Sequence, residues 1–250
     1  MTPAIGIWTL RMEAEKLGHQ LESGLGGHFY KPAQDRNNRE LFAELFGAHA
    51  QWVLVMTTGI AVRYLQGLAR DKATDPGVVV LDEGCRFAVS LLGGHEGGAN
   101  ALAYRVANLT GGVPVVTTAT ETLKPLVVGV GCRKGISAEA IERGIGEALA
   151  KVSRSRSDIR EIATIDLKAQ EPGLLEFCEC NRLPLRVISQ KLIQDRPWVT
   201  NPSAWVRENI GVDGVCEPCA LLATFRGKLI LPKTAIDGVT VAIVEESLDL

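Results

Sequence analysis

The amino-acid sequence predicts an α/β protein of two domains, each a mainly parallel sheet flanked by helices. Short apolar runs alternate with segments of helical periodicity, which is the order that strand-helix-strand units produce. The run Trp52 to Thr57 (WVLVMT) is continuously apolar, as in a strand buried on both faces of a parallel sheet. A proline-containing joint at Glu121 to Pro125 precedes a new strand, so we expect domains at 1–122 and 123–250.

The elements of the first domain follow from apolar runs, helical spacing and glycine punctuation. Strands are expected at short, mainly apolar runs, and helices where the apolar residues recur every three or four positions. Gly111 and Gly112 supply a stop for the last helix. The predicted strands are Ala4 to Trp8, Trp52 to Thr57, Val78 to Leu81, Phe87 to Leu92 and Val113 to Val116, and the predicted helices are Met12 to Glu22, Arg39 to Phe46, Gly59 to Leu68 and Asn100 to Leu109.

The second domain repeats this alternation. Its clearest helix, Ala138 to Val152, has an apolar stripe and Ser137 as a candidate N-cap. The remaining elements are the strands Leu126 to Val130, Ile162 to Asp166, Leu185 to Ile188 and Val239 to Val244, and the helices Gly173 to Cys180 and Pro202 to Asn209.

Composition excludes several classes of function. Apolar residues make up 46% of the 250 residues and charged residues 22%, which is normal for a globular chain. A net charge of −2 gives no long-range field for nucleic acid or an anionic membrane. No run approaches the roughly 20 apolar residues of a membrane span, and Met1 to Thr9 lacks the features of a signal peptide. We therefore expect a cytoplasmic protein that binds neither nucleic acid nor membrane, with its six cysteines reduced.

A glycine cluster lies between a predicted strand and a predicted helix. Gly93, Gly94, Gly97 and Gly98 surround His95 and Glu96 in the segment LLGGHEGGAN. Glycine lets backbone amides approach a ligand, and a helix start adds unpaired N–H groups that favour a carboxylate or phosphate. The imidazole of such a loop is suited to proton transfer near neutral pH. A tight turn that needs glycine for steric reasons, with a structural histidine, explains the cluster equally well.

A second glycine segment, GVGCRKG at 129–135, also follows a strand and precedes a helix. Its glycine spacing is one residue too long for a dinucleotide fingerprint, and neither segment has the lysine and hydroxyl of a phosphate-binding P-loop. Arg133 and Lys134 make it a candidate anion site, although a solvated, passive turn remains open.

The cysteines and the acidic residues give weaker signals. Cys178 and Cys180 together with Cys216 and Cys219 could form a four-thiolate zinc site, but the C-x-C pair lies in an apolar helical pattern, so we expect no metal site. The sequence CEPC is also a weak redox candidate, because thioredoxin-like motifs begin a helix directly after a strand near the N-terminus and this one does not. Charged residues lie at both ends of the predicted strand at Val78, where α/β proteins often keep their sites and where ordinary turns also need them: Asp71, Lys72, Asp75, Asp82 and Glu83.

Several motifs together resemble the cobalt-precorrin-5A hydrolase (CbiG) family. GIAVR at 59–63, DKATDP at 71–76, LLGGHEGGAN at 91–100 and TTAT at 117–120 are similar to its N-terminal part. GVGCRKG at 129–135, EPGLLEF at 171–177 and GVDGVCEPCAL at 211–221 are similar to its C-terminal part, also found alone as a CobE-like module. The resemblance spans nearly the whole chain, without the variable middle segment of longer members. Gly93 stands in place of the usual serine and Cys219 in place of the usual alanine.

The resemblance implies a substrate and a set of site residues. The substrate would be cobalt-precorrin-5A, a cobalt-bound tetrapyrrole with acetate and propionate side chains and a ring A lactone, so the cobalt would arrive with it and the protein would need no cofactor of its own. Hydrolysis of the lactone and loss of acetaldehyde would give cobalt-precorrin-5B. The residues expected to contact the substrate are Gly59, Arg63, Lys72, Asp75, Gly94, Gly97, Gly98, Asn100, Thr117, Thr118, Gly131, Arg133 and Lys134.

Catalysis is assigned to His95, which would activate water for attack on the lactone carbonyl while amides of Gly94, Gly97 or Gly98 stabilise the oxyanion. Asp82 or Glu83 would orient the imidazole or serve the carbon–carbon cleavage. Alternatives are a tetrapyrrole carrier without catalysis and a phosphate-binding α/β regulator. The sequence leaves self-association and contact with other cobalamin-pathway enzymes open.

Overall fold

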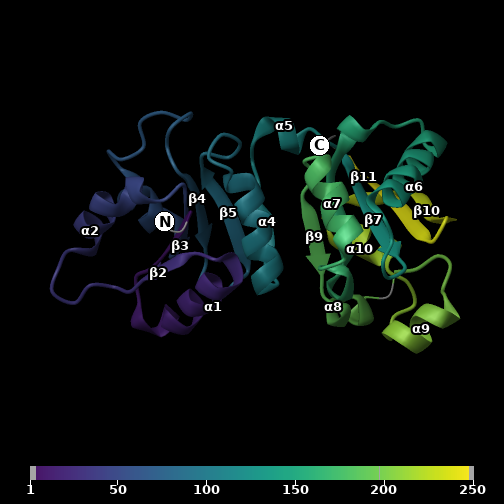
Figure 1. The fold of residues 1–250 in the computed structure, drawn as a ribbon, viewed down its shortest axis with the longest axis horizontal. Helices are drawn as coiled ribbons and strands as arrows, with labels where there is room; N and C mark the ends of the chain where they lie inside the picture. The colour runs from purple at the N-terminus through teal and green to yellow at the C-terminus, as the bar shows by residue number, and fades with distance from the viewer. Residues whose placement is uncertain (1–3, 197, 248–250) are drawn as a thin grey trace. The chain divides into compact units, whose positions relative to one another are not determined.

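The chain folds into two compact units, Met1–Thr118 and Ala119–Leu250. The computed structural model describes residues 4–196 and 198–247. Each unit consists of one sheet with helices packed on both faces, which confirms the α/β prediction (Figure 1).

The first unit contains a six-stranded sheet in the order β2-β1-β3-β4-β5-β6. Neighbouring strands are parallel except β4 and β5, which run antiparallel, with Val78 paired to Leu92 and Leu81 to Ala88. β5 therefore ends at the edge of the sheet where β4 begins. The strands are β1 (Ile5–Thr9), β2 (His28–Tyr30), β3 (Gln51–Val55), β4 (Gly77–Leu81), β5 (Phe87–Leu92) and β6 (Val113–Val115).

Two apolar layers hold this sheet between its helices. Residues on one face of β1, β3 and β4 pack against α1 and α4, and residues on the other face pack against α2 and α3. Gly111, with a φ of 76°, caps the end of α4 in the left-handed conformation, as predicted. The helices are the short 3-10 turn Met12–Ala14, α1 (Glu15–Leu25), α2 (Asn38–Leu45), the 3-10 turn Phe46–Ala48, α3 (Thr58–Leu65) and α4 (Ala99–Thr110).

The second unit contains a five-stranded mixed sheet in the order β10-β11-β7-β8-β9. β7, β8 and β9 are parallel, whereas β11 runs antiparallel to both β7 and β10. The parallel part predicted from sequence is thus extended by an antiparallel hairpin. The strands are β7 (Leu126–Cys132), β8 (Ile159–Ile165), β9 (Leu185–Ile188), β10 (Gly227–Ile236) and β11 (Val239–Glu246).

Helices again cover both faces of this sheet. One face packs against α6 and α7, and the other packs against the C-terminal helices α8, α9 and α10. Ser137 caps α6 as predicted, since its Oγ accepts a hydrogen bond from the Ala140 amide at 3.3 Å. The helices are α5 (Ala119–Thr122), α6 (Ala138–Lys151), α7 (Pro172–Cys180), α8 (Gln190–Asp195), α9 (Ala204–Ile210) and α10 (Cys216–Leu222), with 3-10 turns at Arg156–Asp158 and Asp166–Lys168.

The sequence did not predict β10, although it is the longest strand. It lies at the edge of the sheet, contains Pro232, and pairs with β11 through two register shifts, between Leu229 and Leu231 and between Leu231 and Thr234. Proline has no backbone N–H to donate to a neighbouring strand, so a run that contains proline is a weak strand signal. Proline is nevertheless tolerated at a sheet edge or at a bulge. β2, of three residues, also escaped prediction.

Candidate functional site

The glycine loop, residues 93–98, connects β5 to α4 and packs against the start of β4. Gly93 and Gly98 have φ values of 65° and 72°, which favour glycine. A Cβ on Gly97 would lie 2.6 Å from the amide nitrogen of Gly77, and one on Gly94 would lie 2.7 Å from the Thr118 methyl group. Close packing and left-handed backbone conformations therefore explain much of the glycine content of the loop. This agrees with the alternative that the cluster is a tight turn that needs glycine for steric reasons.

Part of the loop's hydrogen-bonding capacity is already used internally. The amides of Ala99 and Asn100 donate to the carbonyls of Gly93 and Gly94 at 3.1 and 3.0 Å, and the Gly98 amide donates to the His95 carbonyl at 3.1 Å. Gly98 is therefore unavailable as an oxyanion donor, contrary to the prediction. Within the parts of the chain that the structure describes, the Gly94 and Gly97 amides donate no hydrogen bond, so both remain candidate oxyanion donors, and the same holds for the Glu96 amide.

Asn100 fixes the loop to the end of the first unit. Its side-chain amide donates to Thr118 Oγ1 at 3.0 Å, and its Oδ1 accepts from Ser90 Oγ at 2.8 Å. Gly94 packs against both Asn100 and Thr118. Sequence analysis named Asn100 and Thr118 as substrate contacts, but it missed Ser90. The structure makes these three side chains a framework behind Gly94, while Thr117 is exposed.

His95 is an exposed residue of the loop. Glu96, its neighbour, forms an ion pair with Lys72 at 3.7 Å. Asp75 accepts hydrogen bonds from the amides of Arg70 and Asp71 at 2.7 and 3.0 Å, so it shapes the segment that carries Lys72. The structure thus brings Lys72 to the glycine loop and gives Asp75 a structural role.

Asp82 and Glu83 lie at the other end of β4. Because β4 and β5 are antiparallel, Leu92 pairs with Val78, and four residues separate Val78 from Asp82. That separation is about 13 Å along the strand. The prediction that Asp82 or Glu83 orients the imidazole of His95 is therefore wrong, because the antiparallel pairing of β4 and β5 puts the two loops at opposite edges of the sheet.

Asp82 instead holds the β4–β5 turn. Its Oδ1 accepts from the amides of Arg86 and Phe87 at 2.9 and 2.7 Å. Burial alone would raise the pKa of the Asp82 carboxyl, but these bonds, with the one from the Arg86 side chain, leave that pKa below its usual value. Glu83 pairs with Arg11 at 3.4 Å.

Two more residues expected at the site belong to α3. Gly59 lies in its first turn, after the carboxyl end of β3, and Arg63 donates to the Gly59 carbonyl at 3.3 Å. Because β3 and β4 are parallel, Gly59 lies at the same edge of the sheet as Asp82. The glycine loop lies at the opposite edge. The structure therefore does not bring Gly59 to His95.

In the second unit, Gly131 is a packing position rather than a ligand contact. It is buried within β7, its carbonyl accepts from Thr240 Oγ1 at 3.1 Å, and a Cβ there would lie 2.6 Å from that oxygen. Gly129 is packed against α10 in the same way, since a Cβ would lie 1.8 Å from the Cys216 carbonyl. The first glycines of GVGCRKG therefore allow α10 to lie against the sheet.

The exposed residues of this segment, Arg133 and Lys134, follow β7 in a turn that a buried carboxylate anchors. Glu171 accepts hydrogen bonds from the Gly135 amide at 2.8 Å and from Lys168 Nζ at 2.9 Å. The Lys168 hydrogen bond, aided by the Gly135 amide and the charge of Lys134, lowers the pKa of the Glu171 carboxyl against the effect of burial. The EPGLLEF and GVGCRKG motifs are therefore parts of one structure.

An open cavity of about 660 Å³ lies beside this turn. Its polar lining includes Arg133, Ser137, Arg143 and Asp237, and its floor includes Ile136 and Ala140. Lys134 does not line it. Of the two predicted cationic residues, Arg133 and Lys134, only Arg133 lines the cavity. Arg143 also lines it, and the helical spacing of the sequence did not distinguish this residue from an ordinary surface cation.

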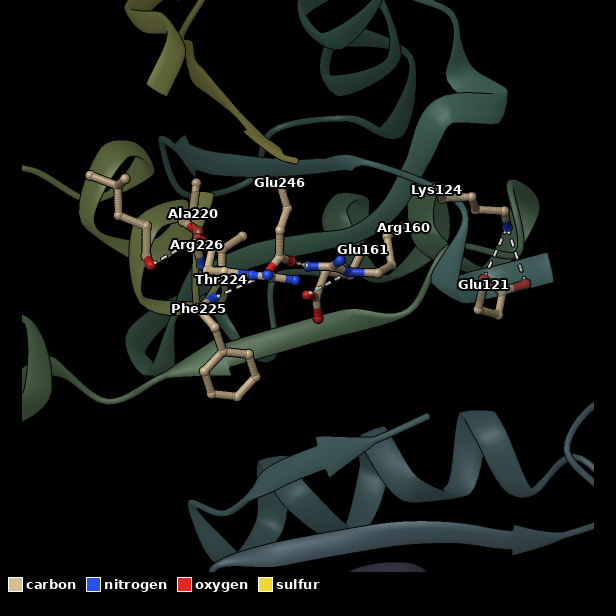
Figure 2. Close-up of polar contacts among 10 residues, drawn as sticks. Glu121, Lys124, Arg160, Glu161, Ala220, Thr224, Phe225, Arg226 and Glu246 are labelled. Atoms are coloured by element: carbon tan, nitrogen blue, oxygen red, sulfur yellow. Dashed lines mark hydrogen bonds and ion pairs between the residues drawn. The ribbon is translucent and has the colours of Figure 1, made fainter. Parts of the chain in front are cut away.

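A half-buried charged cluster occupies the opposite edge of this sheet (Figure 2). Arg160, at the start of β8, pairs with Glu246 at 2.7 Å and with Glu161 at 3.6 Å, and Glu246 accepts from the amides of Phe225 and Arg226 at 3.3 and 3.4 Å. The cluster fixes the turn before β10, and sequence analysis did not predict it.

The described residues contain neither a candidate metal cluster nor a candidate membrane-spanning helix. No group of three or more histidine, cysteine or acidic residues within 4–196 and 198–247 is arranged to hold a metal ion. Burial raises the pKa of the Cys178 thiol to about 12 and that of Cys216 to about 11, which disfavours the thiolate. Among the described helices, none combines the length and apolarity that crossing a membrane requires.

Comparison with known proteins covers most of the chain. The family model described as "Cobalamin synthesis G N-terminal" matches residues 40–121, and the one described as "Cobalamin synthesis G C-terminus" matches residues 126–244. The chain is 24% identical to the cobalt-precorrin-5A hydrolase of Salmonella typhimurium, over 80% of this chain and 83% of that protein. It is 26% identical to the probable cobalt-precorrin-5A hydrolase of Methanocaldococcus jannaschii, over 79% and 86%.

Two solved structures can be aligned with the chain. The crystal structure of CobE, from the cobalamin pathway, matches 50% of this chain and 93% of its own, with 28% identity and a TM-score of 0.47. The match to a putative cobalamin biosynthesis protein G homologue from Sulfolobus solfataricus covers 98% of this chain and 97% of that one, with 20% identity and a TM-score of 0.40. The two family models match consecutive segments in the family's own order, and the chain therefore belongs to the cobalamin synthesis G (CbiG) family.

Proposed function

We propose that this protein is a cobalt-precorrin-5A hydrolase, which opens the ring A lactone of its substrate and releases acetaldehyde to give cobalt-precorrin-5B. Cobalt belongs to the substrate in this proposal, and the protein supplies no cofactor. The names of relatives in Salmonella typhimurium and Priestia megaterium support the reaction.

One observation carries the chemical part of the proposal. The glycine loop carries an exposed imidazole, His95, and two amides without partners in the described chain, Gly94 and Gly97. An ester hydrolase needs a group that accepts a proton from water and donors that stabilise the oxygen of the tetrahedral intermediate. The loop can supply both, and Asn100 with Thr118 keeps it in place.

In the proposed reaction, His95 accepts a proton as water attacks the lactone carbonyl. The Gly94 and Gly97 amides stabilise the oxyanion, each donor being worth about 3 kcal/mol in the barrier when well placed. The ester C–O bond then breaks, and the leaving alkoxide takes the proton back from the imidazole, so that one water has been added across the ester. The hydroxyl freed by lactone opening then gives its proton to solvent and becomes the carbonyl of acetaldehyde as the carbon–carbon bond breaks, and the electron pair of that bond stays with the macrocycle. Asp82 and Glu83, at the far edge of the sheet, are not assigned to this step.

The test is anaerobic incubation of the full chain with cobalt-precorrin-5A, with acetaldehyde measured over time. We expect His95→Ala to lower the rate about 100-fold, the lower range of general-base catalysis. His19→Ala is a matched control, because His19 is an exposed imidazole on α1 that forms surface ion pairs. Near-normal acetaldehyde release by His95→Ala would remove the catalytic role of this residue.

The same assay separates the enzyme from the carrier. A tetrapyrrole carrier would bind the cobalt substrate and release no acetaldehyde at any protein concentration. A phosphate-binding regulator would bind nucleotide or phosphate and ignore the corrinoid. Either outcome would overturn the hydrolase proposal.

A further inference from the structure

The cavity of the second unit has the features of a binding site that the hydrolytic chemistry does not use. Its volume of about 660 Å³ lies within the range of small-molecule pockets. Arg133 and Arg143 both line it, one from the β7–α6 turn and one from the second turn of α6. None of the ion pairs within 4–196 and 198–247 involves either guanidinium, so both are available to a ligand.

The turn places the Arg133 side chain in a defined position. The Arg133 amide donates to the Gly238 carbonyl at 3.2 Å, and a Cβ on Gly238 would lie 2.9 Å from Arg133 Nε. The Arg133 side chain therefore lies directly against the backbone of the β10–β11 turn. Glu171 holds the other end of the same turn through the Gly135 amide. A guanidinium restrained in this way loses less conformational entropy when it binds a ligand.

Close helix packing brings Arg143 to the same cavity. Gly144, the next residue, lies against Val239, where a Cβ would contact that side chain at 3.4 Å. α6 thereby approaches the start of β11, and Arg143 lines the same cavity as Asp237 and Gly238. In the first turn of α6 a helix amide already has a partner, since Ser137 caps the helix. The Glu139 backbone amide, Ser137 and the charge of Arg143 together lower the pKa of the Glu139 carboxyl.

We propose that this cavity is a carboxylate-binding subsite in which Arg133 and Arg143 hold the anion, with Asp237 limiting its affinity. Among the lining residues, two guanidinium groups face one carboxylate, although Glu139 outside the lining also interacts with the charge of Arg143. Guanidinium pairs with a planar carboxylate through two parallel hydrogen bonds. The identity of the ligand rests on the proposed function, since a macrocycle with acetate and propionate arms presents such groups. The existence of the subsite does not depend on hydrolysis.

The subsite is tested by titrating the ¹⁵N-labelled full chain with succinate, propionate and inorganic phosphate while the Gly135 and Gly238 amide resonances are followed. Saturable shifts of both amides with succinate or propionate are expected. The absence of shifts with all three anions would overturn the subsite, and tighter binding of phosphate than of succinate would overturn its assignment to carboxylates.

Three substitutions should change the dissociation constant for succinate differently: one should raise it, one should lower it and one should leave it unchanged. Arg143→Gln should weaken binding about tenfold, near the lower range for a hydrogen bond to a charged group. Asp237→Asn should tighten it about threefold, because it removes a repulsive surface charge, and asparagine tolerates the left-handed φ of 46° at that position. Lys151→Gln removes a charge from the far end of the same helix and should change nothing. If Arg143→Gln and Asp237→Asn bound succinate with equal affinity while keeping the native circular dichroism spectrum, the roles of both residues would be refuted.

Kinetics with cobalt-precorrin-5A distinguish failure of the subsite from failure of the proposed function. If both proposals hold, Arg143→Gln raises KM more than it lowers kcat. An unchanged KM with normal turnover would refute the subsite as a substrate contact and leave the hydrolase intact. Succinate binding without any acetaldehyde release would refute the hydrolase and leave the subsite intact.

Discussion

Replacing Glu171 by glutamine tests the anchor that holds the β7–α6 turn. The carboxylate is buried, with 5% of its side chain exposed, and it accepts one hydrogen bond from the Gly135 amide and one from Lys168. Glutamine fills the same volume and keeps one acceptor oxygen, so it can retain only one of these bonds and leaves the Lys168 ammonium without its counter-charge.

The magnitude follows from those two contacts. A hydrogen bond to a charged group contributes about 1.5 to 3 kcal/mol, and removal of one partner of a well-buried ion pair can cost more. Lys168 is 16% exposed and can turn to water, which reduces the loss. We expect Glu171→Gln to lower the free energy of unfolding by about 2 kcal/mol at neutral pH, a shift of about 1 M in the urea midpoint.

The pH dependence gives a sharper test. The hydrogen bond from Lys168 lowers the pKa of folded Glu171, so its contribution is complete above the unfolded value of about 4.3 and is lost as pH falls through the lower folded value. The difference between the wild type and Glu171→Gln should therefore shrink below about pH 4.

Urea unfolding followed by circular dichroism measures the difference at several pH values. Glu176→Gln, an exposed glutamate on the same helix, should leave the midpoint unchanged. Equal stability of Glu171→Gln and the wild type at pH 7, or a difference that does not vary with pH, would refute the anchor.

Three further predictions concern packing, the β4–β5 turn and thiol reactivity. Gly173→Ala should lower the stability by about 3 kcal/mol, since its Cβ would lie 2.1 Å from a carbonyl oxygen of the turn before α6, whereas Gly146→Ala, in open space on α6, should raise it by about 1 kcal/mol; a rise in the thermal unfolding temperature of the first variant would contradict the first prediction, and a fall in that of the second would contradict the second. Asp82→Ala should cost about 1 to 2 kcal/mol through loss of two bonds to backbone amides, and Asp82→Asn should cost less; an equal loss in both variants would argue against the turn. Alkylation of the native protein at pH 8 followed by mass spectrometry should label exposed Cys180 well before Cys178, because burial raises the pKa of Cys178 to about 12; comparable rates would contradict its burial.

Most elements followed from local sequence because their signals are local. β5 and β9 have the predicted bounds, and Ser137 caps α6 as its position before an apolar stripe implied. The strand pairing did not follow in the same way. A buried run has the same composition in either direction, so composition alone does not give the direction of β5. The signal lies in the connection instead, because residues 82–86 are too few for a parallel crossover and require the antiparallel pairing of β4 and β5.

The errors at the candidate site have the same cause. Asp82 lies close to His95 in sequence, and a parallel arrangement would have put both at the carboxyl edge, so the reversed β5 separates them. Arg143 escaped notice for a different reason: a cation on a helix usually faces water, and only the close approach of α6 to the β10–β11 turn makes it part of a cavity. Sequence signals the residues of a site, whereas the pairing of strands and the approach of helices decide which of them meet.

The irregular outer strand of the second sheet affects how this protein can associate with copies of itself. An edge strand with free amides and carbonyls is a template for a neighbouring chain. In β10, Pro232 offers no amide, two register shifts break the regular spacing of donors and acceptors, and Lys228 would bring its positive charge close to a second copy. Continuous sheet extension through this edge is therefore disfavoured, and filament formation by strand addition would first require removal of the proline and the charge.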